Sequence, residues 1–333
     1  MGSLANDTIS DLLDGDVKTK ANKTGNLSRA KRIADRAPEV MVKISGNTKG
    51  AGHVQAHLDY ISRNGKLEIE DERGETLKGK TAVRALAKDW SQDQGKRRKN
   101  TRETTNIVLS MPDGTEPKAV KNAARAFAKN QFGKNHQYVM ALHTDTDSPH
   151  VHLTVKNLGY DGRRLHVKKG DPQIWRESFA AELERLGVEA EATPRATRGV
   201  IKKGISQAIK HMRDKGMTPA VDQAKIREII EDFSAERAGK EPRPRPWEDK
   251  IKDRQTYVRK AWLTAAKDLN QSDSAEDREL GQSIATFVKD MPPMKTERHE
   301  LQEKVAAQLQ QRGSGQRGGE KGRGQDQEQE DER

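Results

Sequence analysis

Histidines and carboxylates crowd one short stretch of the sequence, HTDTDSPHVHL, which runs from His143 to Leu153. His150 and His152 are two residues apart, and alternate residues of a β-strand lie on the same face. A strand here would therefore point both imidazoles to one side and the apolar residues between and after them to the other. Neutral imidazoles grouped on one face are typical ligands of a divalent metal ion.

The run QYVMALH, just before this stretch, is also typical of a strand and ends at His143. Only TDTDSP separates the two strands, so we expect a hairpin that brings His143 beside His150 and His152. Asp145 would lie at the mouth of this hairpin, where its carboxylate could orient a histidine or accept a proton. Polar residues on a half-exposed sheet are the alternative, but three histidines at this spacing favour a metal site. The pattern does not name a reaction.

A metal-assisted attack on a phosphate also needs a nucleophile, and the chain has no cysteine and only four tyrosines. One of them, Tyr60, lies in HVQAHLDYISRNG, which predicts a short helix. At 100° per residue, Tyr60 falls about 120° from the centre of the apolar stripe of that helix. A tyrosine that only packs in the core would be expected on the stripe, which is formed by Val54, Leu58 and Ile61.

Strand and helix patterns alternate between residues 38 and 204, which predicts an α+β domain large enough to bury a core. The strands are expected over EVMVKIS, TTNIVLS, QYVMALH and HVHLTVKNL, and the helices over TAVRALAKDWSQD, PKAVKNAARAFAKNQFG and WRESFAAELERLG.

The flanking segments have a different composition. Residues 1–37 are polar and irregular and are predicted to be a disordered arm. Residues 205–300 are predicted to be a charged helical region, and residues 301–333 a disordered low-complexity tail.

The net charge of +11 and the pI near 9.6 favour a polyanionic partner such as nucleic acid. The absence of cysteine excludes disulfides and thiolate metal sites. No apolar run approaches the roughly 18 residues that a membrane span needs. We therefore expect a cytoplasmic protein without membrane insertion.

Four motifs follow one another along the chain: HLDYISRNGKLEIED, the HxDxxxPHxH pattern from His143 to His152, LTVKN, and ATPRATRGV near residue 195. Together they resemble the relaxases of conjugative and mobilisable plasmids, in the superfamily of endonucleases named for its His-hydrophobic-His motif. The likeness is to the nuclease domain of the T-DNA border endonuclease and its mobilisation relatives, and it spans about residues 38–204.

This resemblance implies a central antiparallel sheet flanked by helices, followed by a helical and partly disordered C-terminal region. It also implies site- and strand-specific nicking and religation of DNA at a plasmid origin of transfer. Tyr60 would be the nucleophile that becomes joined to the 5′ phosphate, and Asp145 the acidic catalytic residue. His143, His150 and His152 would bind a divalent metal ion, Mg²⁺ or Mn²⁺.

The resemblance and the basic clusters also indicate residues that contact single-stranded origin DNA. These are Arg63, Arg97, Arg98, Ser110, Asn157, Arg163, Arg164 and Lys168. Further partners implied are a relaxosome accessory protein and the coupling protein of a type IV secretion system. The protein would act in a bacterial donor cell and be exported with the DNA into a recipient.

Two alternatives stay open. A rolling-circle replication initiator or a transposase uses the same chemistry, although many initiators place the tyrosine after the histidines. A DNA-binding mobilisation accessory that does not cut is the other, and an intact tyrosine and histidine set argue against it.

Overall fold

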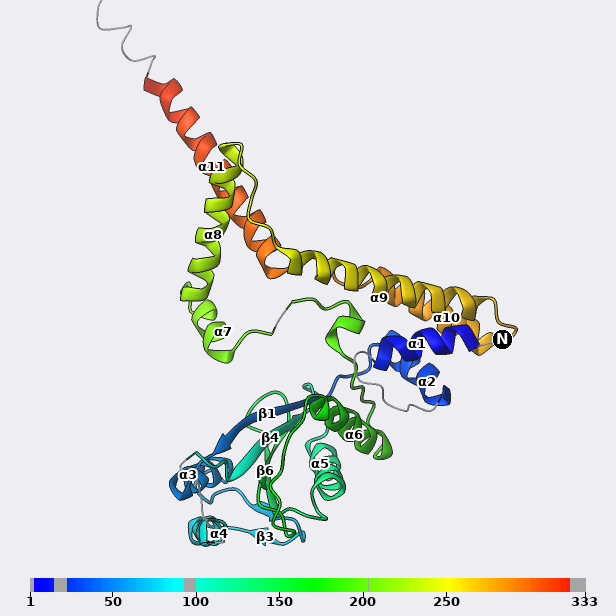
Figure 1. Cartoon of the computed structure of the whole chain (residues 1–333), viewed down its shortest axis with the longest axis vertical. Helices are drawn as coiled ribbons and strands as arrows, with labels where there is room; N and C mark the ends of the chain where they lie inside the picture. Colours follow the sequence, from blue (N-terminus) through cyan, green and yellow to red (C-terminus); the bar gives the residue numbers. More distant parts are fainter. Residues whose placement is uncertain (1–2, 15–22, 93–99, 203, 324–333) are drawn as a thin grey trace, which may run out of the picture.

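The structure is a computed structural model, and it describes residues 3–14, 23–92, 100–202 and 204–323 (Figure 1). Its centre is a six-stranded sheet in the order β1-β4-β6-β5-β2-β3, in which every neighbouring pair is antiparallel. The strands are β1 (Met41–Thr48), β2 (Ile69–Asp71), β3 (Thr76–Leu77), β4 (Thr104–Ser110), β5 (Tyr138–His143) and β6 (His150–Lys156). The predicted central antiparallel sheet flanked by helices is confirmed.

Helices cover both faces of the sheet (Figure 1). One face packs on α5 (Pro117–Gln131) and α6 (Asp171–Arg185), and the other on α3 (Ala51–Ile61) and α4 (Lys80–Gln92). The period of two in the strands produces this division, because residues of opposite parity point to opposite faces. The first face carries Ile107, Leu109, Met140, Val151, Leu153 and Val155, and the second carries Val139 and Ala141.

The register of β5 and β6 places the histidines. His143 pairs with His150, and Ala141 pairs with His152. Directly paired residues of antiparallel strands share a face, so the three imidazoles project together toward the α3 side of the sheet. The predicted hairpin is confirmed.

Helix α3 ends in a turn of three consecutive residues with left-handed backbone. The φ angles are 52° at Arg63, 58° at Asn64 and 81° at Gly65. A Cβ atom on Gly65 would lie 2.4 Å from the backbone nitrogen of Lys80 and 2.6 Å from the carbonyl carbon of Gly79. The turn therefore packs tightly against the start of α4, and only glycine fits there.

Replacing Gly65 with Ala is expected to lower the free energy of unfolding by about 3 kcal/mol, the sum of a left-handed backbone penalty and a backbone clash. Gly74→Ala is the matched control, because Gly74 has a φ of 84° but open space around its Cβ position. The free energy of unfolding of Gly74→Ala should fall by only about 1 kcal/mol. Urea unfolding of both variants measures the difference, and equal losses would show that the close approach to α4 has no energetic weight.

The first residues of the chain are not the disordered arm that was predicted. Residues Ser3–Asp14 form α1 and residues Lys23–Ala34 form α2. Helix α1 packs on α9 (Pro246–Asn270) and α2 packs on α10 (Ala275–Lys289), and the four helices share one apolar core (Figure 1). The prediction was wrong because the overall polarity hides apolar residues at helical spacing, and their packing partners lie more than 200 positions later. The buried apolar residues of the first two helices are Ala5, Ile9, Leu12, Leu13, Ala30 and Ile33.

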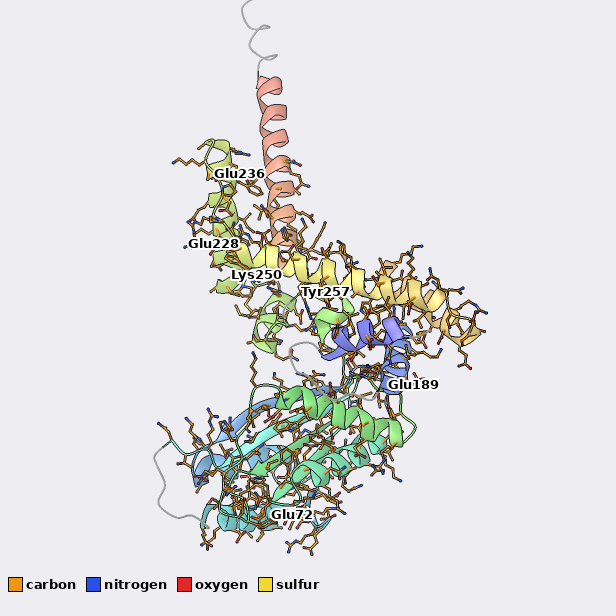
Figure 2. The ribbon with its side chains drawn as sticks, turned by 45° about the vertical axis from the view of Figure 1, so that its right-hand side comes forward. Glu72, Glu189, Glu228, Glu236, Lys250 and Tyr257 are labelled. Carbon is orange, nitrogen blue, oxygen red and sulfur yellow. The ribbon has the colours of Figure 1, made fainter. Side chains whose placement is uncertain are left out.

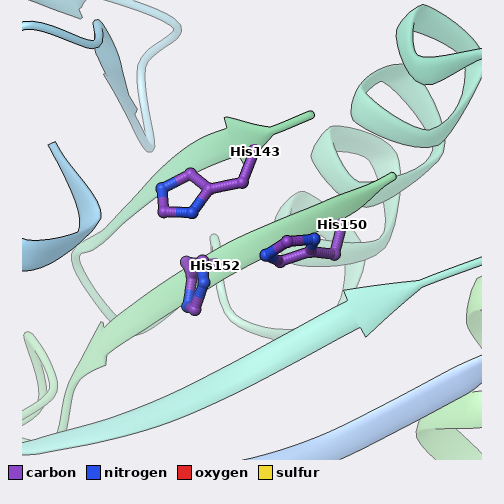
Figure 3. Close-up of side chains that lie close together, drawn as sticks. All are labelled: His143, His150 and His152. Atoms are coloured by element: carbon purple, nitrogen blue, oxygen red, sulfur yellow. The ribbon is translucent and has the colours of Figure 1, made fainter. Parts of the chain in front are cut away.

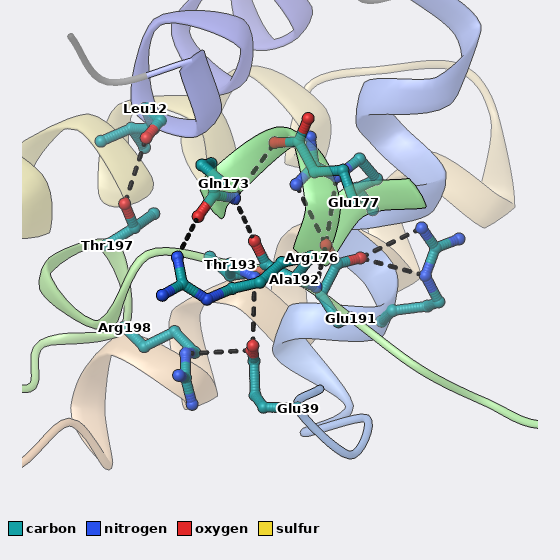
Figure 4. Close-up of polar contacts among 12 residues, drawn as sticks. Leu12, Glu39, Gln173, Arg176, Glu177, Glu191, Ala192, Thr193, Thr197 and Arg198 are labelled. Carbon is teal, nitrogen blue, oxygen red and sulfur yellow. Dashed lines mark hydrogen bonds and ion pairs between the residues drawn. The ribbon is translucent and has the colours of Figure 1, made fainter. Parts of the chain in front are cut away.

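This four-helix module is joined to the sheet domain through polar contacts around residues 191–199, including the 3-10 helix η1 (Arg195–Arg198) (Figure 4). Glu191, with a side chain only 2% exposed, forms ion pairs with Arg29 at 3.1 Å and Arg32 at 3.0 Å. The Thr197 hydroxyl donates to the Leu12 carbonyl at 3.1 Å, and Trp262 Nε1 donates to the Thr197 carbonyl at 2.9 Å. Helices α1 and α9, which are far apart in the sequence, thus contact the same segment.

Because the four-helix module combines the first and the later helices, truncation of the chain after residue 210 should expose apolar surface. A fragment of residues 1–210 would keep α1 and α2 but lose their apolar partners, so we expect it to aggregate and to bind a hydrophobic dye. A fragment of residues 38–204, which lacks both halves of the module, should stay monomeric and folded. Size-exclusion chromatography and dye fluorescence compare the two, and a monomeric, dye-free 1–210 fragment would contradict the expectation.

The rest of the C-terminal region is helical and charged. It contains α7 (Gln207–Asp214), α8 (Ala220–Arg237) and α11 (Glu297–Arg323), and Figure 2 shows Glu228 and Glu236 on α8. Arg213 of α7 forms ion pairs with Asp222 of α8 at 2.7 Å and with Glu297 of α11 at 2.6 Å. Helix α11 runs well into the predicted disordered tail, because its first half is rich in Leu, Ala, Gln, Glu and Lys, which favour helix. Among the described residues, no helix is both long and apolar enough to cross a membrane.

Candidate active site

The three predicted histidines lie together at one end of the β5–β6 hairpin (Figure 3). One ligand nitrogen from each of His143, His150 and His152 lies within 4.8 Å of the others. The ring centroids of His143 and His152 are 4.5 Å apart, and those of His150 and His152 are 5.1 Å apart. Such a cluster of like donors has the composition of a transition-metal site with positions left for substrate.

Backbone carbonyls fix the orientation of two of the imidazoles. His143 Nε2 lies 2.7 Å from the Ile61 carbonyl, and His150 Nδ1 lies 3.1 Å from the Ser148 carbonyl. A carbonyl can only accept, so both of these nitrogens carry a proton, and in the neutral form of each ring the lone pair is on Nδ1 of His143 and on Nε2 of His150. The Ile61 carbonyl is the last of helix α3, so the helix end is bonded directly to a candidate metal ligand.

His152 supplies the strongest sign that the cluster suits a metal ion. Its Nε2 is buried without a hydrogen-bond partner among the described residues, which is costly for a polar atom. Burial, with smaller contributions from His143 and His150, lowers the pKa of His152 to about 3. Burial also lowers the pKa of His143. Both imidazoles are thus neutral near pH 7, as metal ligands must be.

Tyr60 lies beside this cluster, on the exposed side of α3. Its side chain is 52% exposed, whereas the predicted apolar stripe of the helix is buried. Its ring centroid is 5.4 Å from that of His152 and 6.2 Å from that of His143. A phenol accessible to solvent and next to three imidazoles is placed to react with a group bound over them.

The other tyrosines are poorer candidates. Tyr138 is 2% exposed, and burial raises its pKa to about 12. Tyr160 follows β6 at the end opposite the histidines and donates to Glu72 at 3.3 Å. Tyr257 lies on α9 (Figure 2).

Asp145 does not contact a histidine. Its carboxylate forms an ion pair with Arg63, and its side chain is 55% exposed. The predicted orienting role falls instead to the carbonyls of Ile61 and Ser148. Sequence reasoning could not find these partners, because a carbonyl is present at every residue.

His57 is a site residue to which the sequence analysis assigned no role. Its Nε2 lies 2.9 Å from the Thr154 hydroxyl, and its ring stacks near Tyr60 with centroids 6.4 Å apart. Burial lowers its pKa to about 4. His57 therefore ties the tyrosine-bearing helix to β6, two residues beyond His152.

Two of the predicted DNA contacts are buried in hydrogen bonds within the protein. The Ser110 hydroxyl donates to the Pro149 carbonyl at 3.2 Å, and Ser110 is 4% exposed. Asn157, also 4% exposed, donates to the Arg102 carbonyl at 3.1 Å and accepts from the Thr105 hydroxyl at 2.7 Å. Both fix neighbouring strands and loops, so their positions do not support the predicted contact with DNA.

The predicted basic residues are not all gathered at the histidines. Arg63 is there, in contact with His143 and Asp145. Arg163, Arg164 and Lys168 are exposed but follow the far end of β6, which lies roughly 20 Å along the strand from His150. Arg97 and Arg98 lie outside the described residues.

The antiparallel sheet, the histidine cluster and the exposed tyrosine together define the class of relaxase-type nucleases, and comparison with known families agrees. Residues 60–186 match the family model described as relaxase, MobA/VirD2-like, nuclease domain. This segment is therefore a relaxase nuclease domain of the VirD2/MobA type. It includes Tyr60 and all three histidines.

Curated relatives match a longer part of the chain than the family model does. The T-DNA border endonuclease VirD2 of Rhizobium radiobacter is 31% identical over 199 residues, which cover 53% of this chain and 46% of the relative. The 43 kDa relaxation protein of Salmonella typhimurium is 22% identical over 176 residues, which cover 48% and 46%. The chain thus spans about half the length of the curated relatives it matches.

Among solved structures, the MobM relaxase domain bound to oriT DNA aligns with a TM-score of 0.37 and 12% identity. The alignment covers 51% of this chain and 98% of that domain.

Proposed function

We propose that this protein nicks and rejoins one strand of plasmid DNA at an origin of transfer. One observation carries the proposal: the exposed Tyr60 lies beside three histidines that suit a divalent metal ion. The ring centroids of Tyr60 and His152, one of the three, are 5.4 Å apart. The match of residues 60–186 to the relaxase nuclease family supports the substrate class.

In the proposed reaction, the Tyr60 oxygen forms a bond to the scissile phosphorus. The bond between phosphorus and the 3′ oxygen breaks, the 3′ oxygen leaves as a hydroxyl, and Tyr60 remains esterified to the 5′ phosphate. One phosphodiester replaces another, so the step is near energy-neutral. This reversibility lets the same site rejoin the strand, whereas hydrolysis would make the cut permanent.

The residues divide the work. A bound divalent ion, Mg²⁺ or Mn²⁺, would neutralise charge that develops on the phosphate oxygens. His143, His150 and His152 would hold the ion, and His57 would hold the helix of Tyr60 on β6. A free phenol has a pKa near 10, so its proton must be removed during attack. Asp145 is the proposed acceptor, and the carboxylate oxygen that is paired with Arg63 becomes available to the phenol only when this ion pair opens.

By the same resemblance, we propose that the helices beyond residue 205 contact a relaxosome accessory protein and the coupling protein of a type IV secretion system. The protein would act in the cytoplasm of a donor cell and leave it joined to the DNA. Arg63 and the exposed Arg163, Arg164 and Lys168 are proposed contacts to single-stranded origin DNA, as are Arg97 and Arg98. Phosphate contacts of this kind are sequence-blind and weaken with salt.

A nicking assay on supercoiled plasmid tests the proposal. Plasmids that carry a transfer origin, a rolling-circle replication origin or neither should be relaxed only in the first case, and only with Mg²⁺ or Mn²⁺. Relaxation of the replication plasmid would indicate an initiator, and binding without relaxation would indicate a mobilisation accessory.

A further inference from the structure

Arg63 contacts three of the residues to which the proposed function assigns a task, Tyr60, His143 and Asp145. Its Nη2 lies 3.3 Å from His143 Nδ1, and its guanidinium pairs with the Asp145 carboxylate. Its Cζ atom lies 5.5 Å from the centroid of the Tyr60 ring, within cation–π range. One side chain thus joins the tyrosine, a candidate metal ligand and the acidic residue.

The contact with His143 involves the nitrogen that matters for metal binding. Nε2 of His143 donates to the Ile61 carbonyl at 2.7 Å, so only Nδ1 can offer a lone pair to an ion. A guanidinium nitrogen only donates, and here it is directed at that lone pair. Arg63 and a metal ion would therefore compete for the same atom.

We propose that Arg63 closes the metal site: its guanidinium occupies the metal-facing nitrogen of His143 and withdraws when a divalent ion binds. The proposal rests on the proposed function only in that the three histidines bind a metal ion. Withdrawal leaves Arg63 beside Tyr60 with its positive charge available to a DNA phosphate. It also provides the release of Asp145 that proton transfer requires.

The backbone supports a specific role for this residue. Arg63 has a φ of 52°, a left-handed conformation that costs a residue with a Cβ roughly 1 kcal/mol. Asn tolerates this conformation better, and Asn indeed occupies the next position, with a φ of 58°. The conformation is held by Gly65 against α4, and it directs the Arg63 side chain back over α3 toward His143.

Electrostatic repulsion predicts that removal of the Arg63 charge raises the affinity for a metal ion. A guanidinium within a few ångströms of a divalent cation repels it, and the loss of the donor frees the His143 lone pair. If Arg63 only formed a surface ion pair with Asp145, its removal would change metal affinity little, because exposed pairs contribute about 0–1 kcal/mol.

The test is calorimetric titration of the full chain with Mn²⁺, without DNA. Arg63→Gln removes the charge, and Arg63→Met keeps an aliphatic stem against Tyr60 and serves if the Gln variant unfolds. Both should bind Mn²⁺ about ten-fold more tightly than the wild type. Arg73→Gln is the matched control, because Arg73 also pairs with an aspartate, Asp71, but its side chain is 68% exposed and lies on the β2–β3 hairpin.

The outcomes separate the two proposals. Tighter binding in the Arg63 variants alone supports the closed site. An equal increase in Mn²⁺ affinity in Arg73→Gln would attribute the effect to net charge and overturn the closed site. Unchanged or weaker Mn²⁺ binding by the Arg63 variants would also overturn it, provided that His152→Ala abolishes binding. If neither the wild type nor any Arg63 variant binds Mn²⁺, the metal assignment itself fails, and the closed site fails with it.

Discussion

Tyr60→Phe is expected to abolish cleavage of origin DNA while folding, Mn²⁺ affinity and DNA affinity stay close to those of the wild type. The substitution removes one oxygen from a residue that is 52% exposed, and it keeps the ring and its contacts with His57, His143 and His152. The rate should fall at least 1,000-fold, because the nucleophile is absent and a water molecule does not replace a positioned side chain efficiently. If Tyr60 were a hydrogen-bonding contact to DNA instead, binding would weaken by about 1 kcal/mol and cutting would persist.

The wild type should also form a protein–DNA adduct that survives a denaturing gel. Its cross-linked peptide should contain Tyr60 and carry the 5′ side of the cut. Tyr160→Phe is the control, because Tyr160 is equally exposed, at 61%, but lies at the other end of β6. Cutting by Tyr60→Phe at a near wild-type rate, or an adduct on Tyr138 or Tyr160, would refute the assignment.

Replacing His150 or His152 with Ala is expected to remove metal binding and nicking together. Each substitution deletes one of three nitrogen donors, and we expect the Mn²⁺ affinity to fall at least 100-fold. His152→Ala should also stabilise the metal-free protein relative to other buried substitutions, because it removes the unpartnered Nε2. Calorimetry with Mn²⁺ and a nicking assay measure both effects.

His136→Ala is the matched control for burial, since His136 and His152 are both 8% exposed. His136 Nδ1 is bonded to the Lys156 carbonyl at 3.0 Å, at the end of β6 far from the cluster. This variant should lose stability but bind Mn²⁺ as the wild type does. Unchanged Mn²⁺ affinity in both His150→Ala and His152→Ala would sink the metal assignment.

The strands and the histidine cluster were predictable because strand periodicity is local. The alternation of apolar and other residues in QYVMALH and HVHLTVKNL fixes which residues share a face of the sheet. The connection of six residues is so short that the two strands are expected to pair as neighbours. The exposed position of Tyr60 followed from helical periodicity in the same way. These features depend on residues within about twenty positions of one another.

Long-range features were not predictable from periodicity. The polar first helices are stabilised by α9 and α10, so no local signal distinguishes them from a disordered arm. Ser110 and Asn157 look like surface polar residues in the sequence, yet the sheet buries them in hydrogen bonds to other strands and loops. The contacts of Arg63 depend on a left-handed turn that places it over the helix it follows.

The pairing of the first two helices with α9 and α10 also governs the order in which the chain matures during synthesis. About 210 residues separate the end of α2 from the start of α9, which is roughly 10–40 s of translation at 5–20 residues per second. During that interval Ile9, Leu12 and Ile33 have emerged from the ribosome, but the surface that buries them does not yet exist. The sheet domain can complete itself first, whereas the helical module can close only after α9 and α10 have been synthesised, and until then the apolar residues of its first half are open to association with other chains.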